Sequence, residues 1–596
     1  MIALVTRRAL LDYARRPLNL VFLVAVPVVI VVALAGELTT FSKLLNVAAK
    51  PVHLEVATAG WAAAAVAGLA GFFQVLGSRD ADRRLAAVSG RATPVVVGRL
   101  GAAGALAVAA AAAATVALAA RAGITDPFRV LSVVLLVAVT FMAIGVLVGT
   151  LVRSEMNGAL IVTFIWMLNV FVGAGSGGGS SFVARIFPLH FPTQVLIGQA
   201  SGHSGPIGDV GWSLLWAIGL SALAVARLAS TTRATGRKAV EPGSTPASTM
   251  RSPVVSTVAS PPVTSLAQPR SPVVVTPATA SLLPADLSTV RPRAATRLVA
   301  GSRAAARDYG RNRVLWVLLI VVPVAFIALA AEQTPTKLMP VALVAGARHF
   351  TAMISLRQVH AAEMASVASA LLAGIAGLFV VTGSTDGDRR LVLAGFRPRE
   401  VLVGHLGVVA GAAVLISATS LAVSAAWISP QQWAVYAGAD VLIALTYAMI
   451  GMLLGPLTGR LGGLYLILLL TLVDVGYGQT VMYNPIPPTW GAFLPARGAG
   501  RLLIDGAFSL GLSGVRYLLL ALGWLAVLTA GAAVTFRFRI GKKVALAVVT
   551  TQTPTVPPLI PVFDVPRPTQ DTVIDPCTLV PTEARGREPM RTEVRP

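Results

Sequence analysis

Two related copies of one pattern occupy this chain. The charged element Asp82-Arg83-Arg84-Leu85 returns 306 positions later as Asp388-Arg389-Arg390-Leu391. Glycines and a phenylalanine repeat at the same offset: Gly68, Gly71, Phe73, Gly98, Gly145 and Gly149 correspond to Gly374, Gly377, Phe379, Gly404, Gly451 and Gly455. Because charged residues repeat together with apolar ones, hydrophobicity alone does not explain the pattern. We interpret it as an internal duplication.

The composition indicates an integral membrane protein. Hydrophobic residues make up 55% of the chain and charged residues 12%, whereas soluble domains contain about 25% charged residues. A helix that crosses an apolar core of about 30 Å needs about 20 residues. Apolar stretches predict twelve such spans, near 18–36, 56–77, 101–121, 130–152, 157–174, 207–229, 314–331, 361–383, 405–427, 436–457, 461–478 and 513–536. The single cysteine, Cys577, excludes a disulfide within the chain and a cysteine metal cluster.

The distribution of charge predicts the topology. Most of the 48 Lys and Arg residues fall in segments on the same side of the predicted spans as the N-terminus, so both termini are expected in the cytoplasm. Six spans per copy would make the copies parallel. The formal charge of +23 then reflects topology and anionic headgroups rather than nucleic-acid binding. The abundance of Ala, Gly, Val and Arg favours a bacterial protein of the cytoplasmic membrane.

Four segments follow from this pattern. We expect six-span repeats at 1–232 and 297–543, joined by a disordered linker at 233–296 and followed by a disordered tail at 544–596. The linker and tail are rich in Pro, Ser and Thr and show no sustained hydrophobic period. The fold class is therefore an all-α polytopic membrane protein.

A short amphipathic segment precedes the first span of each copy. Residues 2–16 suit a helix that lies in the cytoplasmic interface, and Asp12-Tyr13-Ala14-Arg15 returns as Asp308-Tyr309-Gly310-Arg311. The residues singled out here are Asp12, Tyr13, Arg15, Asp308, Tyr309 and Arg311. A merely solvated juxtamembrane helix is the alternative interpretation.

A charged cytoplasmic element lies between the second and third spans of each copy. It predicts a short helix, a turn at Gly90 or Gly395, and a return to the membrane. A topology signal would need only positive charge. Repetition of an acid and two arginines favours a surface fitted to a partner, formed by Asp82, Arg83, Arg84, Gly90, Asp388, Arg389, Arg390 and Gly395.

Polar residues within or next to the spans are candidates for a path or gate. Asn169 and Asp474 occupy matching places in the fifth span of each copy, and Glu37 and Glu332 close the first spans. Such groups are costly in a bilayer and usually face a cavity or a neighbouring helix. For Asn169 and Asp474 the alternatives are substrate contact and an interhelical hydrogen bond. His53 and His360, near Glu55 and Glu363, suggest an outer gate or pH-sensitive contact, but two histidines in different copies make no convincing metal site.

In the order of these features the chain resembles an ABC-2-type permease fused as two six-span units. The family carries an interfacial helix, a coupling helix between spans two and three, and a broken outer segment between spans five and six. The last feature matches Phe187-Pro188 and Phe191-Pro192 in one copy and Phe493-Leu494-Pro495 in the other, which makes Pro192 and Pro495 gate candidates. The resemblance implies efflux of a hydrophobic or amphiphilic compound, such as an antibiotic, drug or lipid-like metabolite.

The chain lacks the means to hydrolyse ATP. It contains no Gly-x-x-x-x-Gly-Lys-Ser/Thr motif and no soluble stretch of about 200 residues for an ATPase domain. The resemblance therefore implies one or more ATPase subunits, binding ATP and Mg²⁺, as separate partners beside membrane lipid and cargo. This chain would have no catalytic residue and bind no cofactor or nucleic acid.

Two other classes are open. A major-facilitator-type secondary transporter, driven by a proton gradient, also has twelve spans in parallel halves. Its glycine–acid–arginine signature fits poorly here, because Asp82 follows Gly77 by five positions and the next glycine is Gly90. A membrane scaffold without transport activity is the third class.

Overall fold

The computed structural model describes residues 1–44, 51–124, 126–170, 184–198, 205–233, 307, 310, 313–345, 348–393, 395–482 and 488–552. Side chains at 34–44, 51–54, 344–345, 348–349, 386 and 539–552 are outside this description. Residues Met1–Val544 form one compact unit and Ala545–Pro596 a second. Everything below concerns the first unit, apart from the last turns of the final helix. The predicted linker and nearly all of the predicted tail lie outside the described residues.

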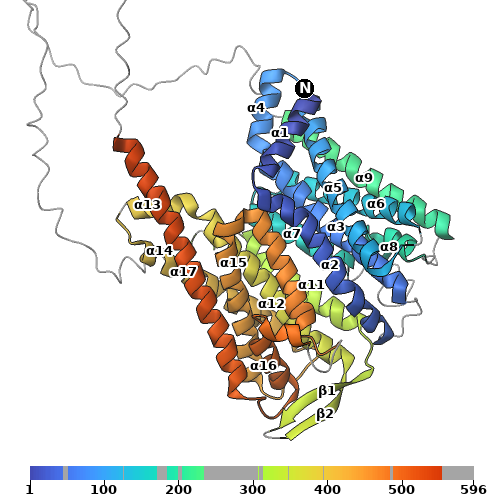
Figure 1. Ribbon diagram of the computed structural model, residues 1–596, viewed down its shortest axis with the longest axis vertical. Helices are drawn as coiled ribbons and strands as arrows, with labels where there is room; N and C mark the ends of the chain where they lie inside the picture. Colours follow the sequence, from blue (N-terminus) through green and yellow to red (C-terminus); the bar gives the residue numbers. More distant parts are fainter. Residues whose placement is uncertain are drawn as a thin grey trace, which may run out of the picture. The chain divides into compact units, whose positions relative to one another are not determined.

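The described part is almost entirely helical (Figure 1). The N-terminal half contains α1 (Ile2–Ala14), α2 (Pro17–Leu44), α3 (Pro51–Leu76), α4 (Arg79–Ser89), α5 (Thr93–Ala122), α6 (Pro127–Leu151), α7 (Glu155–Leu168), the short 3-10 turn η2 (Ala184–Ile186), α8 (His190–Ile197) and α9 (Gly205–Arg233). The C-terminal half contains α11 (Arg313–Gln333), β1 (Leu338–Ala345), β2 (Arg348–Ser355), α12 (Leu356–Gly383), α13 (Thr385–Leu393), α14 (Pro398–Ser424), α15 (Trp433–Leu470), η5 (Thr471–Gly478), η6 (Thr489–Phe493), α16 (Arg497–Phe508) and α17 (Val515–Gln552).

The chain is a multi-pass membrane protein. Nine described helices are long and apolar enough to cross a bilayer, and α1 with the first part of α2, bent by 84°, would make ten. Twelve spans were predicted. The difference lies in two places: α7 is described as a helix of 14 residues, and residues 171–183 are outside the description; the predicted spans 436–457 and 461–478 are counted together as one segment, Trp433–Gly478. That segment consists of two helices joined at Gly459, whose φ of 75° is not helical. The Tyr447 hydroxyl donates to the Leu470 carbonyl oxygen at 3.0 Å, so the chain turns back at Gly459, as the two predicted spans require.

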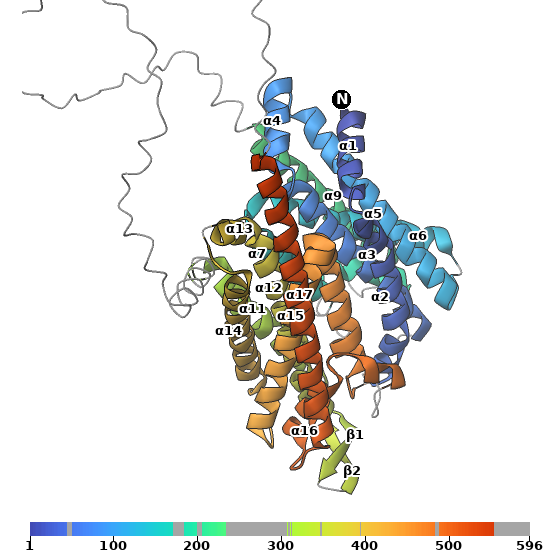
Figure 2. The ribbon, with the colours of Figure 1, turned by 60° about the vertical axis from the view of Figure 1, so that its left-hand side comes forward.

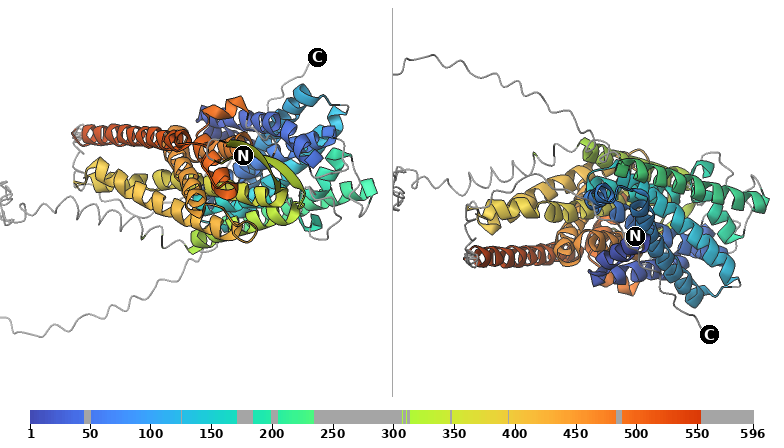
Figure 3. Two further views of the ribbon diagram at one scale, coloured as in Figure 1. Left: turned by 90° about the horizontal axis from the view of Figure 1, so that it is seen from below. Right: turned by 90° about the horizontal axis from the view of Figure 1, so that it is seen from above.

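Two helices, α3 and α12, form the centre of the fold. The most apolar stretch of α12 is entirely buried, whereas only 17% of the most apolar stretch is buried in α17, and likewise in α9. End-on views place α9 and α17 at the edges of the bundle (Figure 3). The central helices pack closely on their partners through glycine. A Cβ on Gly145 of α6 would lie 1.9 Å from the Gly68 carbonyl oxygen of α3, and one on Gly451 of α15 would lie 2.0 Å from that of Gly374 in α12.

A β-hairpin interrupts the helical pattern between α11 and α12. Strands β1 and β2 pair antiparallel from Leu338↔Ser355 to Ala345↔Arg348. Met339, Val341 and Leu343 are buried, which is the alternation expected for a strand with one covered face. This hairpin was not predicted, because long apolar stretches reveal spans but not a period of two. Figure 2 shows the hairpin at the opposite end of the unit from α1 and α4.

Candidate functional site

A cavity of about 900 Å³ lies between the two halves. Its walls come from the junction of α1 and α2, the last turns of α3 and α12, and the break in α15. A volume of this size suits a drug-sized molecule. Six charged residues line it: Asp12, Arg15, Arg16, Arg99, Glu155 and Arg460. We call it the inter-half cavity.

The break in α15 shapes one wall of the inter-half cavity. Gly459 has φ 75° and ψ −173°, a conformation that a residue with a side chain rarely adopts. A Cβ there would also lie 2.6 Å from Nη1 of Arg16, which comes from the other half. The next residue, Arg460, forms an ion pair with Glu155 of α7 and donates a 3.0 Å hydrogen bond to the Thr382 carbonyl oxygen. The break therefore joins the two halves at the cavity.

Buried tyrosines add a second connection between the halves. The Tyr465 hydroxyl donates to the Val66 carbonyl oxygen of α3 at 3.0 Å, and it lies next to the Tyr13 hydroxyl. Tyr13 donates to the Asn19 carbonyl oxygen at 3.2 Å. Since Tyr13 closes α1 and Asn19 opens α2, this group fixes the bend between those helices against α15.

The acid of each repeated charged element points inward. Asp82 of α4 is buried and accepts bonds from Arg99 Nε at 3.0 Å and Nη2 at 2.6 Å, and from Ser78 Oγ at 2.8 Å. These contacts connect α4 to the following helix, α5. Asp82 was predicted to lie on a surface fitted to a partner, but it lies beneath that surface.

The second copy repeats this arrangement with one substitution. Asp388 of α13 is buried and accepts a bond from Ser384 Oγ at 2.9 Å. His405 of α14, the counterpart of Arg99, lies with Nε2 2.8 Å from Asp388 Oδ1. The short helix α13 is thus connected to α14 as α4 is to α5, through histidine instead of arginine.

The outer faces of α4 and α13 carry arginines, together with the exposed Asp80 in α4. Arg84, Arg389 and Arg390 are exposed, while Arg83 is half-buried with Nη1 3.7 Å from Asp80. Both helices end at glycines with positive φ, Gly90 at 65° and Gly395 at 94°, as predicted for turns that return the chain to the bundle.

At the base of α4, Arg79 donates to the Gly149 and Thr150 carbonyl oxygens of α6. Burial, with a smaller effect of the nearby Arg83 and Arg153, lowers the pKa of its guanidinium. An arginine stays charged despite such a shift, so Arg79 is a permanent cation that holds α4 against the end of α6.

Asn169 and Asp474 form equivalent hydrogen bonds in the two halves. The Asn169 side-chain oxygen accepts from the Leu189 amide at 3.1 Å, and Asp474 accepts from the Ala496 amide at 2.9 Å. Leu189 and Ala496 are the residues that immediately precede α8 and α16. A polar acceptor at a helix N-terminus satisfies amides that lack partners within the helix. Of the two interpretations left open by the sequence, the geometry matches the interhelical hydrogen bond.

The other predicted gate residues are spread over the opposite end of the unit from α4. Glu332 is exposed and accepts from Trp427 Nε1 at 3.0 Å. Pro192 is buried inside α8, and Pro495 lies just before α16. Glu37 falls in α2, but its side chain is outside the described set.

The interfacial residues are only partly described. In α1, Asp12 pairs with Arg15 at 2.8 Å on an exposed face and Tyr13 is buried. Asp308, Tyr309 and Arg311 lie outside the described residues, so the predicted second interfacial helix stays a prediction.

The histidine–glutamate pair at the start of α12 is buried. His360 Nδ1 lies 2.6 Å from Thr334 Oγ1, and Glu363 accepts from the Val481 amide at 2.7 Å and from the Thr480 hydroxyl. Glu363 thus connects α12 to the chain that follows η5. The side chain of His53, the equivalent residue in the first copy, is not described.

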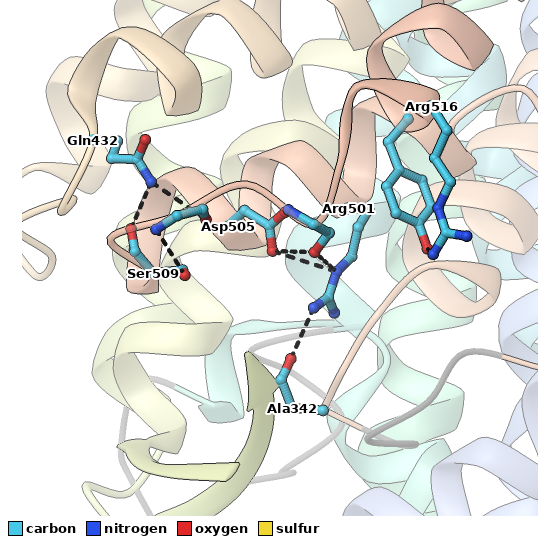
Figure 4. A network of polar contacts seen from close by, with 9 residues as sticks. Ala342, Gln432, Arg501, Asp505, Ser509 and Arg516 are labelled. Atoms are coloured by element: carbon cyan, nitrogen blue, oxygen red, sulfur yellow. Dashed lines mark hydrogen bonds and ion pairs between the residues drawn. The ribbon is translucent and has the colours of Figure 1, made fainter. Parts of the chain in front are cut away.

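Asp505 and Asp440 are two of the buried carboxyls that were not predicted from the sequence. Asp505 accepts from the Ser513 amide at 2.7 Å and from its hydroxyl at 2.8 Å, and Arg501 lies 3.3 Å away (Figure 4). Arg501 also donates to the Ala342 carbonyl oxygen of β1 at 3.1 Å, so this group attaches the hairpin to α16. The four-residue spacing of Arg501 and Asp505 was the available signal. The second carboxyl, Asp440 of α15, is fully buried.

Comparison with known proteins does not assign a family. Neither the models of protein families nor the curated proteins include a match to this chain.

Proposed function

We propose that this protein is the membrane subunit of an ATP-driven exporter of the ABC-2 type, built from two parallel six-helix repeats. The observation that supports this most is the inter-half cavity, which is lined at once by Ser78 at the base of α4 and Thr385 at the base of α13. Two short basic helices therefore lie beside the same cavity, one from each half. The duplicated glycine contacts of α3 with α6 and of α12 with α15 support the repeat.

The buried acids give the short helices a mechanical role. A helix attached only by its ends would bend under a load, whereas Asp82–Arg99 and Asp388–His405 connect the middle of α4 and α13 to the long helices α5 and α14. A partner that pushes on the basic outer faces would move those long helices as rigid bodies. The arginines would contact the partner, and the acids would position the arginines.

Movement of the halves would open the inter-half cavity. Its boundary includes the Arg460–Glu155 ion pair and, beside it, the bond from Tyr465 to the Val66 carbonyl. Both connect the halves, so separation breaks both. Cargo would enter from the α4 side, which we assign to the cytoplasm from the positive charge of α4 and α13.

The apolar bundle suits a hydrophobic or amphiphilic cargo, such as an antibiotic, a drug or a lipid-like metabolite. ATP and Mg²⁺ would be bound by one or more separate ATPase subunits, and this chain would perform no catalysis. The membrane would be the bacterial cytoplasmic membrane, with both termini on the cytoplasmic side.

Co-purification tests the proposal. The tagged full chain, extracted gently from its native membrane, is expected to bring with it a stoichiometric subunit that hydrolyses ATP. The triple variant Arg84→Ala, Arg389→Ala, Arg390→Ala should lose this subunit while keeping its size-exclusion profile. Arg129→Ala is the matched control, because Arg129 is also an exposed arginine, paired at i,i+3 with Asp126 at the start of α6.

Two results would contradict the proposal. A chain that purifies alone and moves substrate into vesicles under a proton gradient without ATP would instead identify a secondary transporter. A bound ATPase that the triple variant and the control retain equally would place its docking surface elsewhere than α4 and α13.

A further inference from the structure

A group of hydroxyls surrounds a carboxyl inside the second half. Asp440 of α15 and Ser369, Ser417 and Ser420 have no exposed surface. Ser369 of α12 donates to Asp440 Oδ2 at 2.8 Å, and Ser417 of α14 also interacts with this carboxyl. Three membrane-spanning helices thus contribute to one polar group.

The register of α14 and α15 brings Ser420 to the same level. Ser424 and Tyr436, near the connection between these helices, have their hydroxyl oxygens 3.4 Å apart. Ser420 lies four residues from Ser424, and Asp440 lies four residues from Tyr436. Because four residues are about one helical turn, Ser420 faces the level of Asp440. Ser417 lies on the same face of α14 about one turn further on.

The first half shows that the fold does not need this polar group. At the offset of 306, the residues that correspond to Ser369, Ser417, Ser420 and Asp440 are Ala63, Ala111, Ala114 and Val134. All four are fully buried. Apolar residues therefore suffice at these positions, and a specific role is needed to explain a carboxyl and three hydroxyls in one half only.

Several of these oxygens have unused bonding capacity. Asp440 Oδ1 and the hydroxyls of Ser417 and Ser420 are buried without a geometrically acceptable hydrogen bond among the described residues. Serine and threonine hydroxyls in helices usually bond to a carbonyl of the preceding turn, as Thr419 does to Leu415 at 2.9 Å. Ser417 and Ser420 do not, so their lone pairs are available to a ligand.

The charge of the site defines that ligand. In the described part of the chain, no Lys, Arg or His forms an ion pair with Asp440. A single carboxylate in an apolar interior is costly unless a positive charge neutralises it. Hard oxygen ligands favour alkali and alkaline-earth cations, and one carboxylate balances one positive charge. We infer that Asp440, Ser369, Ser417 and Ser420 form a binding site for Na⁺.

Thermal unfolding of the purified full chain tests this inference. The midpoint is measured as NaCl replaces choline chloride at constant ionic strength. A site present only in the folded protein raises the midpoint as it fills, so the wild type should show a rise that saturates. Asp440→Asn, which keeps the side-chain shape, should abolish the rise. Ser420→Ala should increase the half-saturating Na⁺ concentration about tenfold, which corresponds to about 1.4 kcal/mol.

Thr419→Ala provides the control, because it removes a hydroxyl from the same helix that is bonded to its own backbone. It should leave the Na⁺ response unchanged. If Asp440→Asn does not fold, Ser417→Ala and Ser420→Ala carry the test. Equal midpoints in Na⁺ and choline would overturn the inference. A midpoint that follows pH but not Na⁺ would also overturn it and would identify a protonated carboxyl instead. Neither outcome affects the proposed ATPase partner.

Discussion

The contact between Gly145 and Gly68 leads to the sharpest test of the packing. A Cβ added by Gly145→Ala would lie 1.9 Å from the Gly68 carbonyl oxygen, where real Cβ contacts are not shorter than 3.0 Å. The obstacle is backbone, so no side-chain rotation relieves it. Helices α3 and α6 would have to separate locally by about 1 Å, the difference between these two values. Gly451→Ala creates the same conflict, at 2.0 Å from the Gly374 oxygen.

The expected magnitude follows from two opposing effects. Overpacking a tight interface costs about 1–3 kcal/mol, occasionally more, and a rigid backbone obstacle places this case near the upper value. Replacing glycine by alanine inside a helix contributes about 1 kcal/mol in the other direction. We therefore expect Gly145→Ala to lower the free energy of unfolding by about 2 kcal/mol. For a chain of this length, with about 2.1 cal/mol/K of unfolding entropy per residue, this corresponds to a decrease of about 2 °C in the unfolding midpoint.

Gly104→Ala is the matched control. Gly104 lies inside α5, and a Cβ there would meet no atom within 4 Å. Only the helix-propensity effect remains, so this variant should be more stable by about 1 kcal/mol. The unfolding midpoint of each variant is measured in one detergent by fluorescence-detected size exclusion after heating. The reasoning fails if Gly145→Ala and Gly451→Ala are as stable as Gly104→Ala. It also fails if only one of them is destabilised, because the two contacts are geometrically equivalent.

Two further predictions concern buried polar contacts and use the same thermal assay at one fixed pH. Asp82→Ala should cost about 3–5 kcal/mol, because it leaves the permanently charged and largely buried guanidinium of Arg99 without its carboxylate partner; Asp388→Ala should cost less, since the partner there is an imidazole, which is not a permanent cation. Equal losses in these two variants would contradict the argument from charge. Tyr465→Phe should cost about 0.5–1.5 kcal/mol, because it removes one hydrogen bond between the halves while the Val66 carbonyl keeps its bond within α3; an unchanged midpoint would show that water replaces that bond.

The sequence predicted most of the helical organisation because apolar length is a direct signal of a span. The described residues give nine or ten candidate spans where the sequence predicted twelve, for two reasons. The segment that became α7 is apolar to residue 174, but its described helix ends at Leu168. The segment Trp433–Gly478 is counted as one, but it consists of two helices joined at Gly459, where Pro456 and Gly459 predict an interruption. The hydrogen bond from Tyr447 to the Leu470 carbonyl oxygen shows that the chain turns back at this break.

Equivalent residues at a fixed offset predicted positions well and contacts poorly. The repeated charged elements do form short helices ended by glycines. Their acids, however, face inward. This was missed because the partners, Arg99 and His405, are different residue types, so the offset alone did not connect them to Asp82 and Asp388. Asp440 was missed because its counterpart is Val134, and the comparison of the copies looked only for what they share.

What the two halves share and what they do not therefore carry different information. Shared residues, such as the contacting glycines and the acids of α4 and α13, hold helices together, and their loss is expected to act on stability. Differences at equivalent buried positions are not required by packing, because each half shows that the alternative residue fits. The two short helices are attached differently, because α4 is held through Arg99 and α13 through His405. The second half has an internal polar site, because serines and an aspartate occupy the positions where the first half has alanines and a valine. If the halves move against each other during transport, these positions give them unequal responses to charge and ions, while the glycine contacts give them equal responses to packing.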